Sequence, residues 1–336
     1  MINIAVVGCG YWGPNLIRNF NEIDGSNMYI CCDLDQKKLD SMKKRFPGLK
    51  ITKDYNEVLK DKNVDAVSIA TPPATHFKLV KEALMADKHV IVEKPLTLKS
   101  VDAKELIKIA KERKRILMVG HTFEYVPAVN KLKELIKSGE LGEVYYIYTN
   151  RLNLGLWQPD CNVIWDLAPH DISIILYLLE QEPVSVCAKG AWHVDEGKED
   201  VAFITLTFPN KRICHLHVSW LDPLKVRKTV VVGSKKMVVF DDVEQIEKLK
   251  IYDKSVSKHD SYTSFGEFQM SYNYGDAHIP KISSSEPLKI ECTHFLECIR
   301  DNKKPRSDGE SGLRVVKVLE AAEESIKNNG KEVVVK

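Results

Sequence analysis

The sequence predicts an α/β protein of two domains: an N-terminal doubly wound parallel sheet, and a C-terminal α+β domain with a large, open, mainly antiparallel sheet. Three observations support this. A glycine-rich turn follows the first apolar run, short apolar runs alternate with amphipathic stretches up to about residue 121, and strand-like segments then follow one another directly. The 336 residues are enough for two cores of ordinary size. We place the first domain at 1–121 and the second at 122–291, and we expect tail helices within 292–336 to pack back near the first.

The first domain is expected to alternate strands and helices. Apolar runs predict strands at 2–7, 28–32, 66–70, 89–92 and 116–119, and amphipathic stretches predict helices at 36–46, 54–59, 75–85 and 100–114. Asp54 with Glu57 three residues on predicts a capping box, and Ser100 is expected to cap the helix that it opens. Because crossover connections between parallel strands are right-handed, this alternation predicts helices on both faces of one parallel sheet.

The second domain shows another pattern, in which segments with period-2 alternation follow one another. These segments are 144–150, 184–191, 201–208, 212–220, 226–232 and 237–240. They predict a mainly antiparallel sheet. One helix is expected near 128–138, and another has the apolar stripe Ile172, Ile175, Leu176 and Leu179. We expect long loops over 253–286, tail helices at 288–300 and 312–327, and a last strand at 333–335.

The glycine-rich turn after the first strand reads Gly8-Cys9-Gly10-Tyr11-Trp12-Gly13. Gly8 allows the tight turn, Gly10 lets the backbone approach a pyrophosphate, and Gly13 lets the next helix pack close to the sheet. The amides and the positive dipole end of that helix then face the phosphates. The turn therefore predicts a Rossmann-type nicotinamide site, with Tyr11 and Trp12 in the binding loop, rather than a chance glycine turn.

An acidic residue stands at the spacing that this site requires. Asp33 ends the second apolar run, where its carboxylate can accept hydrogen bonds from both ribose hydroxyls. A carboxylate there repels a 2′-phosphate, so NAD is favoured over NADP. Lys37 and Lys38 could still accommodate NADP, and that alternative stays open.

Composition excludes several classes of partner. The net charge of +2, from 49 basic and 47 acidic residues, gives no global field for nucleic acid or an anionic membrane. No apolar run approaches the length needed to span a bilayer, and no basic segment precedes the first apolar run as in a signal peptide. Eight cysteines without a CxxC pair are typical of reduced thiols, so we expect a cytoplasmic protein. No ligands are clustered at metal spacing, and we predict no catalytic metal.

Two further segments end strands at the edge where open α/β sheets hold ligands. Thr71 and Pro72 follow the strand at 66–70, and Glu93 and Lys94 end the strand at 89–92. The Lys94 ammonium could hydrogen-bond a reacting hydroxyl and stabilise its developing negative charge. A surface lysine at a strand end is the equally weighted alternative.

Two histidines lie close to these segments in sequence. His76 is expected in the first turn of its helix, and His121 follows the last strand of the first domain and is expected to border the same crevice.

A third candidate segment, Trp165-Asp166-Leu167-Ala168-Pro169-His170-Asp171, opens the helix of the second domain. With Asp166 as N-cap, Pro169 falls at the third helical position, where no intrahelical N–H is expected. Asp166 and His170 then lie one turn apart on one face. A carboxylate near an imidazole fixes its tautomer, as a general acid/base requires. A capping aspartate beside an ordinary polar histidine is the alternative, and Asp171 could be only a favourable first-turn charge.

Together and in this order, the three segments resemble the glucose–fructose oxidoreductase / inositol dehydrogenase / MocA family. The resemblance rests on the glycine fingerprint, Glu93-Lys94-Pro95 and the Asp166-x-x-x-His170 pair, and it extends to Pro305 and the tail helix. It implies that Lys94 and His170 flank the substrate hydroxyl and that Asp166 orients the pair. Glu124 departs from the pattern, since this position is often arginine in the family.

Within the family, the chain looks similar to members that act on nucleotide-linked sugars. The resemblance implies an NAD-dependent enzyme that oxidises a secondary hydroxyl, at C3, of a sugar such as UDP-N-acetylglucosamine. Its substrate-binding residues would include His121, Arg151 and Trp165 beside Lys94, Asp166 and His170. The alternatives are an NADPH-dependent 3-ketoreductase of a dTDP-sugar, a dehydrogenase of free inositol or sugar, and a catalytically silent NAD-sensing module. An open sheet with an exposed apolar face also predicts a homodimer or homotetramer.

Overall fold

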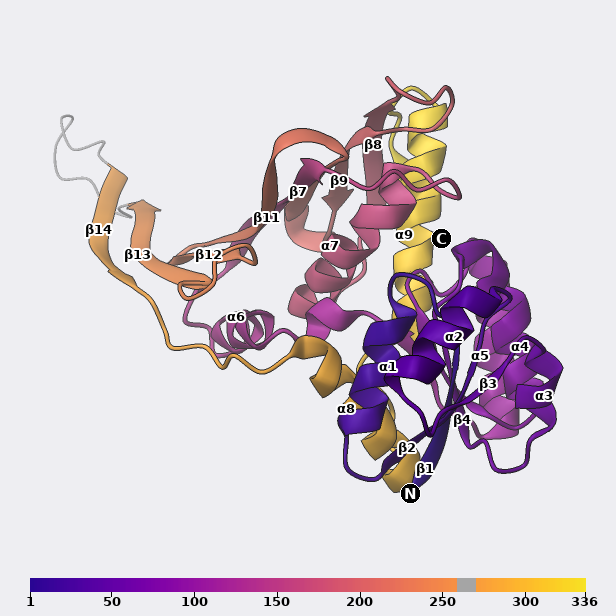
Figure 1. Cartoon of the computed structure of the whole chain (residues 1–336). Coiled ribbons are helices and arrows are strands. Elements are labelled where there is room, and N and C mark those ends of the chain that lie inside the picture. The colour runs from indigo at the N-terminus through magenta and orange to yellow at the C-terminus, as the bar shows by residue number, and fades with distance from the viewer. Residues whose placement is uncertain (259–269) are drawn as a thin grey trace, which may run out of the picture. The chain divides into compact units, whose positions relative to one another are not determined.

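The computed structural model describes residues 1–258 and 270–336, which form two compact units. Unit 1 contains Met1–Tyr125 and Ser285–Glu320, and unit 2 contains Val126–Ser284 and Ala321–Lys336. Figure 1 shows both units and labels most of their helices and strands.

Unit 1 is built on a parallel sheet with strand order β3-β2-β1-β4-β5-β6. This is the order of a doubly wound dinucleotide-binding fold, and it confirms the predicted fold class. The strands are β1 (Ile2–Val7), β2 (Ser26–Cys32), β3 (Lys50–Thr52), β4 (Ala66–Ile69), β5 (His89–Glu93) and β6 (Leu117–Gly120).

Helices connect these strands and cover the sheet. They are α1 (Gly13–Glu22), α2 (Gln36–Arg45), α3 (Tyr55–Lys60), α4 (His76–Met85) and α5 (Ser100–Arg113). The same unit also contains the short helix η2 (Thr122–Tyr125) and the tail helix α8 (Pro287–Asp301). The buried stripe of α1 includes Leu16, Ile17 and Phe20, and the Phe20 ring lies 6.4 Å from that of Phe295 on α8. Apolar burial therefore attaches α8 to the first part of the chain.

Asp54 caps its helix as predicted, but two other predictions about helix starts in unit 1 are wrong. The Asp54 side chain does cap α3, but the Glu57 carboxylate accepts the Thr52 hydroxyl (2.7 Å), so no capping box forms. Ser100 is the first residue of α5 rather than its cap. Its backbone N–H donates to Glu320 (2.9 Å), so a carboxylate distant in sequence does what the serine hydroxyl was expected to do.

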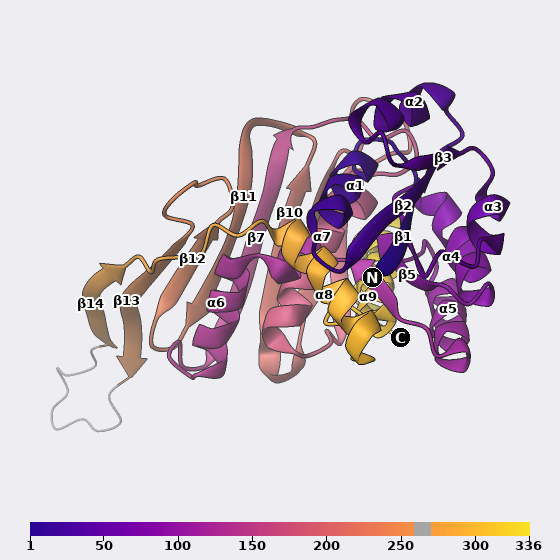
Figure 2. The same cartoon turned by 60° about the horizontal axis from the view of Figure 1, so that its bottom comes forward.

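Unit 2 contains a mixed, mostly antiparallel sheet with strand order β14-β13-β12-β11-β7-β10-β9-β8-β15, as expected for the second domain (Figure 2). Neighbours are antiparallel except that β7 and β10 run parallel. The strands are β7 (Val144–Leu154), β8 (Ser185–Ala191), β9 (Val201–Thr207), β10 (Ile213–Ser219), β11 (Leu221–Gly233), β12 (Met237–Asp241), β13 (Leu249–Lys258), β14 (Met270–His278) and β15 (Val333–Val334).

The two faces of this sheet differ in character. Helices α6 (Pro127–Lys137) and α7 (Val163–Leu179) lie against one face, where β10 buries Cys214, Leu216 and Val218. Alternate residues of the same strand, Ile213 and His215, are exposed on the other face. The period-2 alternation of the sequence thus separates a helix-covered face from an open face.

The predicted loops over 253–286 need correction. Much of this stretch forms the outer strands β13 and β14, and residues 259–269 lie outside the described part of the chain. Tyr274 pairs with Lys254 and Tyr272 with Val256 in antiparallel register. Pairing with a neighbouring strand outweighs a composition rich in Ser and Gly, because strand propensity depends strongly on context.

The last helix, α9 (Gly309–Lys327), contributes to both units in turn. In unit 1, Gly312 lies so close to Val119 that an added Cβ would come within 2.7 Å of it. In unit 2, Ser325 accepts the backbone N–H of Ala188 on β8 (2.8 Å). Across residues 1–258 and 270–336, we find no helix with the length and apolar character needed to cross a bilayer.

Candidate active site

The glycine turn between β1 and α1 has the geometry of a pyrophosphate loop. Gly8 has φ +94°, and an added Cβ would lie 2.4 Å from the carbonyl oxygen of Ala70. A Cβ at Gly13 would lie 2.0 Å from the carbonyl oxygen of Gly8, so the start of α1 fits against the strand only without a side chain. Gly10, in contrast, has no heavy atom within 4 Å of such a Cβ. The backbone at Gly10 is therefore open to a ligand, with the N-terminus of α1 next to it.

Asp33 is held beside this loop by two backbone amides. Its Oδ2 accepts the N–H of Cys9 (2.7 Å) and its Oδ1 accepts that of Asp35 (2.8 Å). Each carboxylate oxygen keeps a second lone pair for a ribose hydroxyl. Leu34 is 83% exposed and offers no hydrogen bond to a 2′-phosphate. These residues fit NAD.

His76 links the ends of the neighbouring strands β4 and β5. It is the first residue of α4, in agreement with the prediction that it lies in the first turn of this helix. Its ring nitrogens lie 2.8 Å from the carbonyl oxygen of Pro95 and 2.9 Å from that of Thr71. The side chain is fully buried, so it links the turns after β4 and β5. Pro72 is exposed at the first of these turns. His76 therefore holds together two turns at the carboxyl edge of the sheet.

Glu93 and Lys94 lie at the end of β5, which is separated by β4 from the strand that leads into the glycine loop. The Glu93 carboxylate covers Gly120, where an added Cβ would come within 3.2 Å of its Oε2. Burial raises the pKa of Glu93 to about 7, against the opposing effect of the Lys94 ammonium. A cation and a carboxyl group that can hold a proton near neutral pH thus stand side by side at the carboxyl edge of the sheet.

His121 follows β6 and is 1% exposed. Within the described ranges, neither of its ring nitrogens has a hydrogen-bond partner. Burial, together with the positive charges of Lys94 and Arg314, lowers the pKa of His121 to about 3. A buried neutral imidazole without a partner is uncommon in folded proteins, and it is the kind of group that a bound ligand satisfies.

In unit 2, helix α7 begins earlier than the sequence predicted. Its N-cap is Asn162, whose side chain accepts the backbone N–H of Trp165, so the prediction of Asp166 as N-cap is wrong. Pro169 accordingly lies inside the helix rather than at its third position. The loss of one intrahelical N–H is tolerated because the surrounding helix is packed in the core. Asp166 and His170 are still one helical turn apart, because both lie within α7.

Asp166 and His170 are partly exposed on α7, whereas Trp165, Ala168 and Pro169 are buried. The two polar side chains therefore share the accessible side of the helix. Asp166 Oδ2 accepts the indole N–H of Trp220 (3.1 Å). Trp165, a predicted substrate contact, is only 6% exposed and packs into the interior of unit 2.

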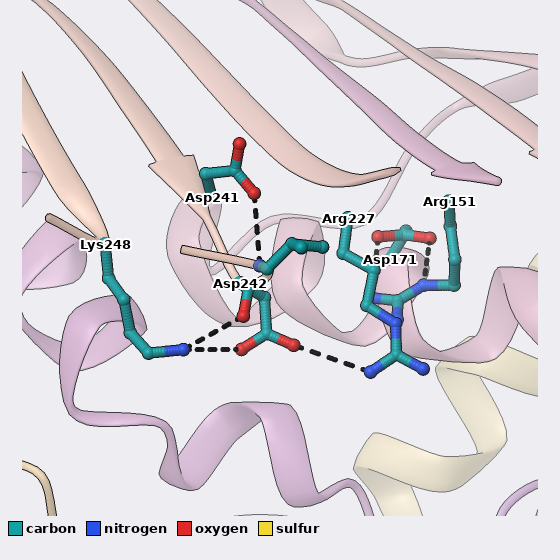
Figure 3. A network of polar contacts seen from close by, with 7 residues as sticks. Arg151, Asp171, Arg227, Asp241, Asp242 and Lys248 are labelled. Carbon is teal, nitrogen blue, oxygen red and sulfur yellow. Dashed lines mark hydrogen bonds and ion pairs between the residues drawn. The ribbon is translucent and has the colours of Figure 1, made fainter. Parts of the chain in front are cut away.

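Arg151, another predicted substrate contact, forms a buried bidentate pair. Its Nε and Nη2 donate to the carboxylate of Asp171 at 2.8 and 3.1 Å, and both side chains are almost fully buried (Figure 3). Nearby, the Asp242 carboxylate lies 3.6 Å from Arg227 and 3.3 Å from Lys248. Because Asp171 follows His170 directly, the Arg151 pair joins β7 to the accessible turn of α7.

Three residues of these sites were not found from sequence: Asn162, Trp220 and Glu291. Asn162 lies in a segment with the composition of a loop, which does not mark it as the start of a helix. Trp220 looks in the sequence like an ordinary core aromatic at the end of a strand. Glu291 is fully buried on α8 and accepts the Thr122 hydroxyl (2.8 Å), and burial together with the charge of Glu93 raises its pKa well above the usual range. A charged residue in an amphipathic helix gives no signal of such burial. Among residues 1–258 and 270–336, no three His, Cys, Asp or Glu side chains gather as metal ligands.

Comparison with known proteins agrees with this arrangement. One family model, described as an oxidoreductase family with an NAD-binding Rossmann fold, matches residues 2–121, and a second, the GFO/IDH/MocA C-terminal domain, matches residues 129–239. The chain is 30% identical to UDP-N-acetylglucosamine 3-dehydrogenase of Acidithiobacillus ferrooxidans, over 75% of this chain and 76% of that protein. It is 26% identical to myo-inositol 2-dehydrogenase of Thermotoga maritima, over 97% of this chain and 96% of that protein.

A solved structure extends the likeness to the whole fold. That of UDP-N-acetylglucosamine 3-dehydrogenase from Acidithiobacillus ferrooxidans has a TM-score of 0.81 at 25% identity, covering 97% of this chain and 98% of that one. Fold and sequence together define an NAD-binding oxidoreductase with a Rossmann fold. The chain belongs to the GFO/IDH/MocA oxidoreductase family.

Proposed function

We propose that this protein is a nucleotide-sugar dehydrogenase that oxidises the C3 hydroxyl of a sugar such as UDP-N-acetylglucosamine to a ketone with NAD. The observation that carries the proposal is the pair of partly exposed side chains, Asp166 and His170, one turn apart on α7. A carboxylate and an imidazole at this spacing suit proton transfer at a hydroxyl. The likeness to UDP-N-acetylglucosamine 3-dehydrogenase supports the choice of substrate class.

The coenzyme half of the reaction belongs to unit 1. Bound NAD supplies the acceptor for the hydrogen that leaves the substrate carbon. The turn Gly8–Gly13, with Tyr11 and Trp12, would hold the pyrophosphate, and Asp33 the ribose. Thr71, Pro72 and the Glu93–Lys94 turn would border the nicotinamide end, with His76 behind them.

Proton transfer is assigned to three residues. His170 takes the hydroxyl proton, and Asp166 orients the imidazole so that one nitrogen faces the substrate. The Lys94 ammonium stabilises the negative charge that develops on the substrate oxygen. His121 is proposed as a further substrate contact, because its ring nitrogens have no hydrogen-bond partner within 1–258 and 270–336. For Arg151 and Trp165, burial favours a supporting role.

Substitution at Lys94 and His170 tests these roles. Lys94→Ala and His170→Ala should each lower turnover by about 10²–10⁴, the usual contribution of a positioned acid or base. NAD affinity, measured by calorimetry, should stay within a few-fold of the wild type. The matched control Lys99→Ala removes an exposed lysine from the same connection and should leave turnover unchanged. Near-native turnover in both variants would overturn the assignment.

A substrate panel tests the substrate class. The wild-type enzyme is incubated with NAD and UDP-N-acetylglucosamine, dTDP-glucose or myo-inositol, and the formation of NADH is followed. Turnover of the UDP-sugar well above that of free inositol supports the proposal. The second candidate, a dehydrogenase of free polyols, is favoured by the full-length likeness to myo-inositol 2-dehydrogenase and would give the opposite order.

Two other outcomes of the same panel are informative. Reduction of a 3-keto-dTDP-sugar with NADPH but not NADH would indicate a ketoreductase. NAD binding without turnover of any substrate would indicate an NAD-sensing module.

A further inference from the structure

Trp220 is a buried tryptophan whose indole N–H forms a hydrogen bond with Asp166, one of the residues assigned to proton transfer. It follows β10, is 1% exposed, and its indole Nε1–H donates to Asp166 Oδ2 at 3.1 Å. An indole N–H is only a donor and does not titrate in the working range of an enzyme. A hydrogen bond from it therefore favours the ionised carboxylate, which accepts, and fixes which oxygen faces the indole.

The indole itself has little freedom. The Trp220 backbone N–H donates to Asp200 (2.9 Å), and its carbonyl accepts the N–H of Gly155 (3.0 Å). An added Cβ on Gly155 would lie 2.9 Å from Trp220 Cδ1, so the glycine backbone packs directly on the ring. The Trp157 ring lies 4.9 Å away with an interplanar angle of 51°. Packing on two sides and hydrogen bonds at both backbone groups hold the donor in one place.

The helix turn that carries the acceptor, Asp166, is also fixed by hydrogen bonds. Asn162 caps α7 through the N–H of Trp165, and its side-chain amide donates to Glu199 (2.7 Å). The backbone N–H of Val163 donates to the Glu199 carbonyl (3.0 Å). Hydrogen bonds thus attach the first turn of α7 to the connection before β9, and the backbone that carries Asp166 has a defined position.

We propose that Trp220 is a positioning residue: its fixed indole N–H orients the Asp166 carboxylate, and through it the imidazole of His170. This inference rests on the proposed function. It assigns Trp220 no contact with substrate, and it explains why an indole, rather than a phenyl ring, occupies a buried site that packing alone could fill.

The kinetic test replaces the indole without emptying the site. Trp220→Phe should lower kcat about tenfold to a hundredfold, the loss expected for a hydrogen bond to a charged group, while the KM for NAD stays unchanged. Trp192→Phe is the matched control, since it makes the same substitution at a half-exposed tryptophan of unit 2 and leaves the surroundings of Trp220 unchanged. It should stay within about threefold of the wild type.

A double-mutant cycle separates positioning from packing. In an Asp166→Ala background, Trp220→Phe should have almost no further effect on kcat, because the group that it positions is gone. If Trp220→Phe lowers kcat equally in both backgrounds, or if Trp192→Phe is as damaging, the loss does not come from the hydrogen bond to Asp166 and the proposal is wrong.

A spectroscopic readout decides the hydrogen bond even if no sugar is turned over. The chain has five tryptophans, so the indole N–H region of a ¹H–¹⁵N spectrum is simple, and the resonance missing in Trp220→Phe belongs to Trp220. Asp166→Ala should move that resonance, and Asp276→Ala, which removes an exposed carboxylate of β14, should not. An unmoved Trp220 resonance in Asp166→Ala would overturn the proposal, whereas failure of the substrate panel alone overturns only the proposed function.

Discussion

At the scale of single residues, burial controls the charge of the groups at the coenzyme edge. His121 shows this most clearly, because burial and two neighbouring cations lower its pKa to about 3. The imidazole is therefore neutral in the folded protein at pH values where it is protonated in the unfolded chain. Folding then releases a proton, and protonation of the unfolded chain destabilises the fold as the pH falls.

This linkage gives a prediction for stability against pH. The stability that His121 contributes is complete above the unfolded value near 6.5 and is lost as the pH falls from there toward about 3. The loss is about 1.4 kcal/mol per pH unit from this one group. His121→Leu should flatten the fall of the thermal midpoint between pH 7 and pH 5, measured by differential scanning fluorimetry. His278→Leu, at an exposed position of β14, serves as control and should keep the wild-type slope. Equal slopes for His121→Leu and the wild type would contradict the prediction.

The same scale shows what a sequence can and cannot reveal of a site. Lys94, Asp166 and His170 could be singled out because their residue types carry chemistry and their positions follow from strand ends and helix spacing. Trp220 could not, because its importance lies in a hydrogen bond to a residue 54 positions away. The unpartnered nitrogens of His121, observed over the described ranges, likewise depend on the packing of β6, η2 and α9 around it, which no local pattern encodes.

At the scale of elements, strand and helix types were predictable, and their ends were not. Alternation and apolar runs identify β1 and β10 well, since the period of burial is written directly in the sequence. The caps of α5 and α7 depend on which polar group reaches the free amides. For α5 this is Glu320, and for α7 it is Asn162 rather than the expected Asp166. Several residues can supply such a contact, so composition alone does not select one.

The Arg151–Asp171 pair gives a prediction at this scale. Because both groups are buried, removal of Asp171 takes away the carboxylate that accepts two hydrogen bonds from the Arg151 guanidinium between β7 and α7. Asp171→Ala should therefore cost about 3–5 kcal/mol of unfolding free energy. The double variant Arg151→Met with Asp171→Leu should recover most of the loss, because an apolar pair of similar volume can replace a buried ion pair. Thermal and urea unfolding measure both. Native-like stability in Asp171→Ala, with a raised KM for the sugar, would instead make Arg151 a substrate contact.

At the scale of the whole molecule, the doubly wound parallel sheet of unit 1 and the mostly antiparallel character of unit 2 followed from the sequence. Right-handed crossovers leave few topologies for a strand–helix alternation, and a glycine turn after the first strand narrows them further. The outer strands β13 and β14 were missed because their residues are largely exposed and polar, so no burial pattern marks them. Strand pairing at a sheet edge is set by the neighbouring strand more than by the composition of the edge itself.

The open face of the unit 2 sheet carries a further expectation, self-association. Tyr146, Phe203 and Ile213 are 44–48% exposed on adjacent strands, and the Phe203 ring stacks on His217 with centroids 4.3 Å apart. Register places Ile213 beside Tyr146 and His217 beside Phe203, so these side chains form one continuous surface. An apolar surface of this kind is normally covered, and in a symmetric oligomer the same face of a second copy of the chain covers it.

We therefore predict a homodimer or homotetramer formed through this face. Sedimentation velocity of the wild-type protein should show a species of at least twice the mass of one chain. Phe203→Glu combined with Ile213→Glu should shift it to monomer, because two carboxylates on the face cannot be desolvated without large cost. Val194→Glu, which adds the same charge at an exposed loop position of unit 2, should leave the assembly intact. A monodisperse wild-type monomer at micromolar concentration would exclude the predicted assembly, and dissociation by Val194→Glu would show that general charge, rather than this face, controls it.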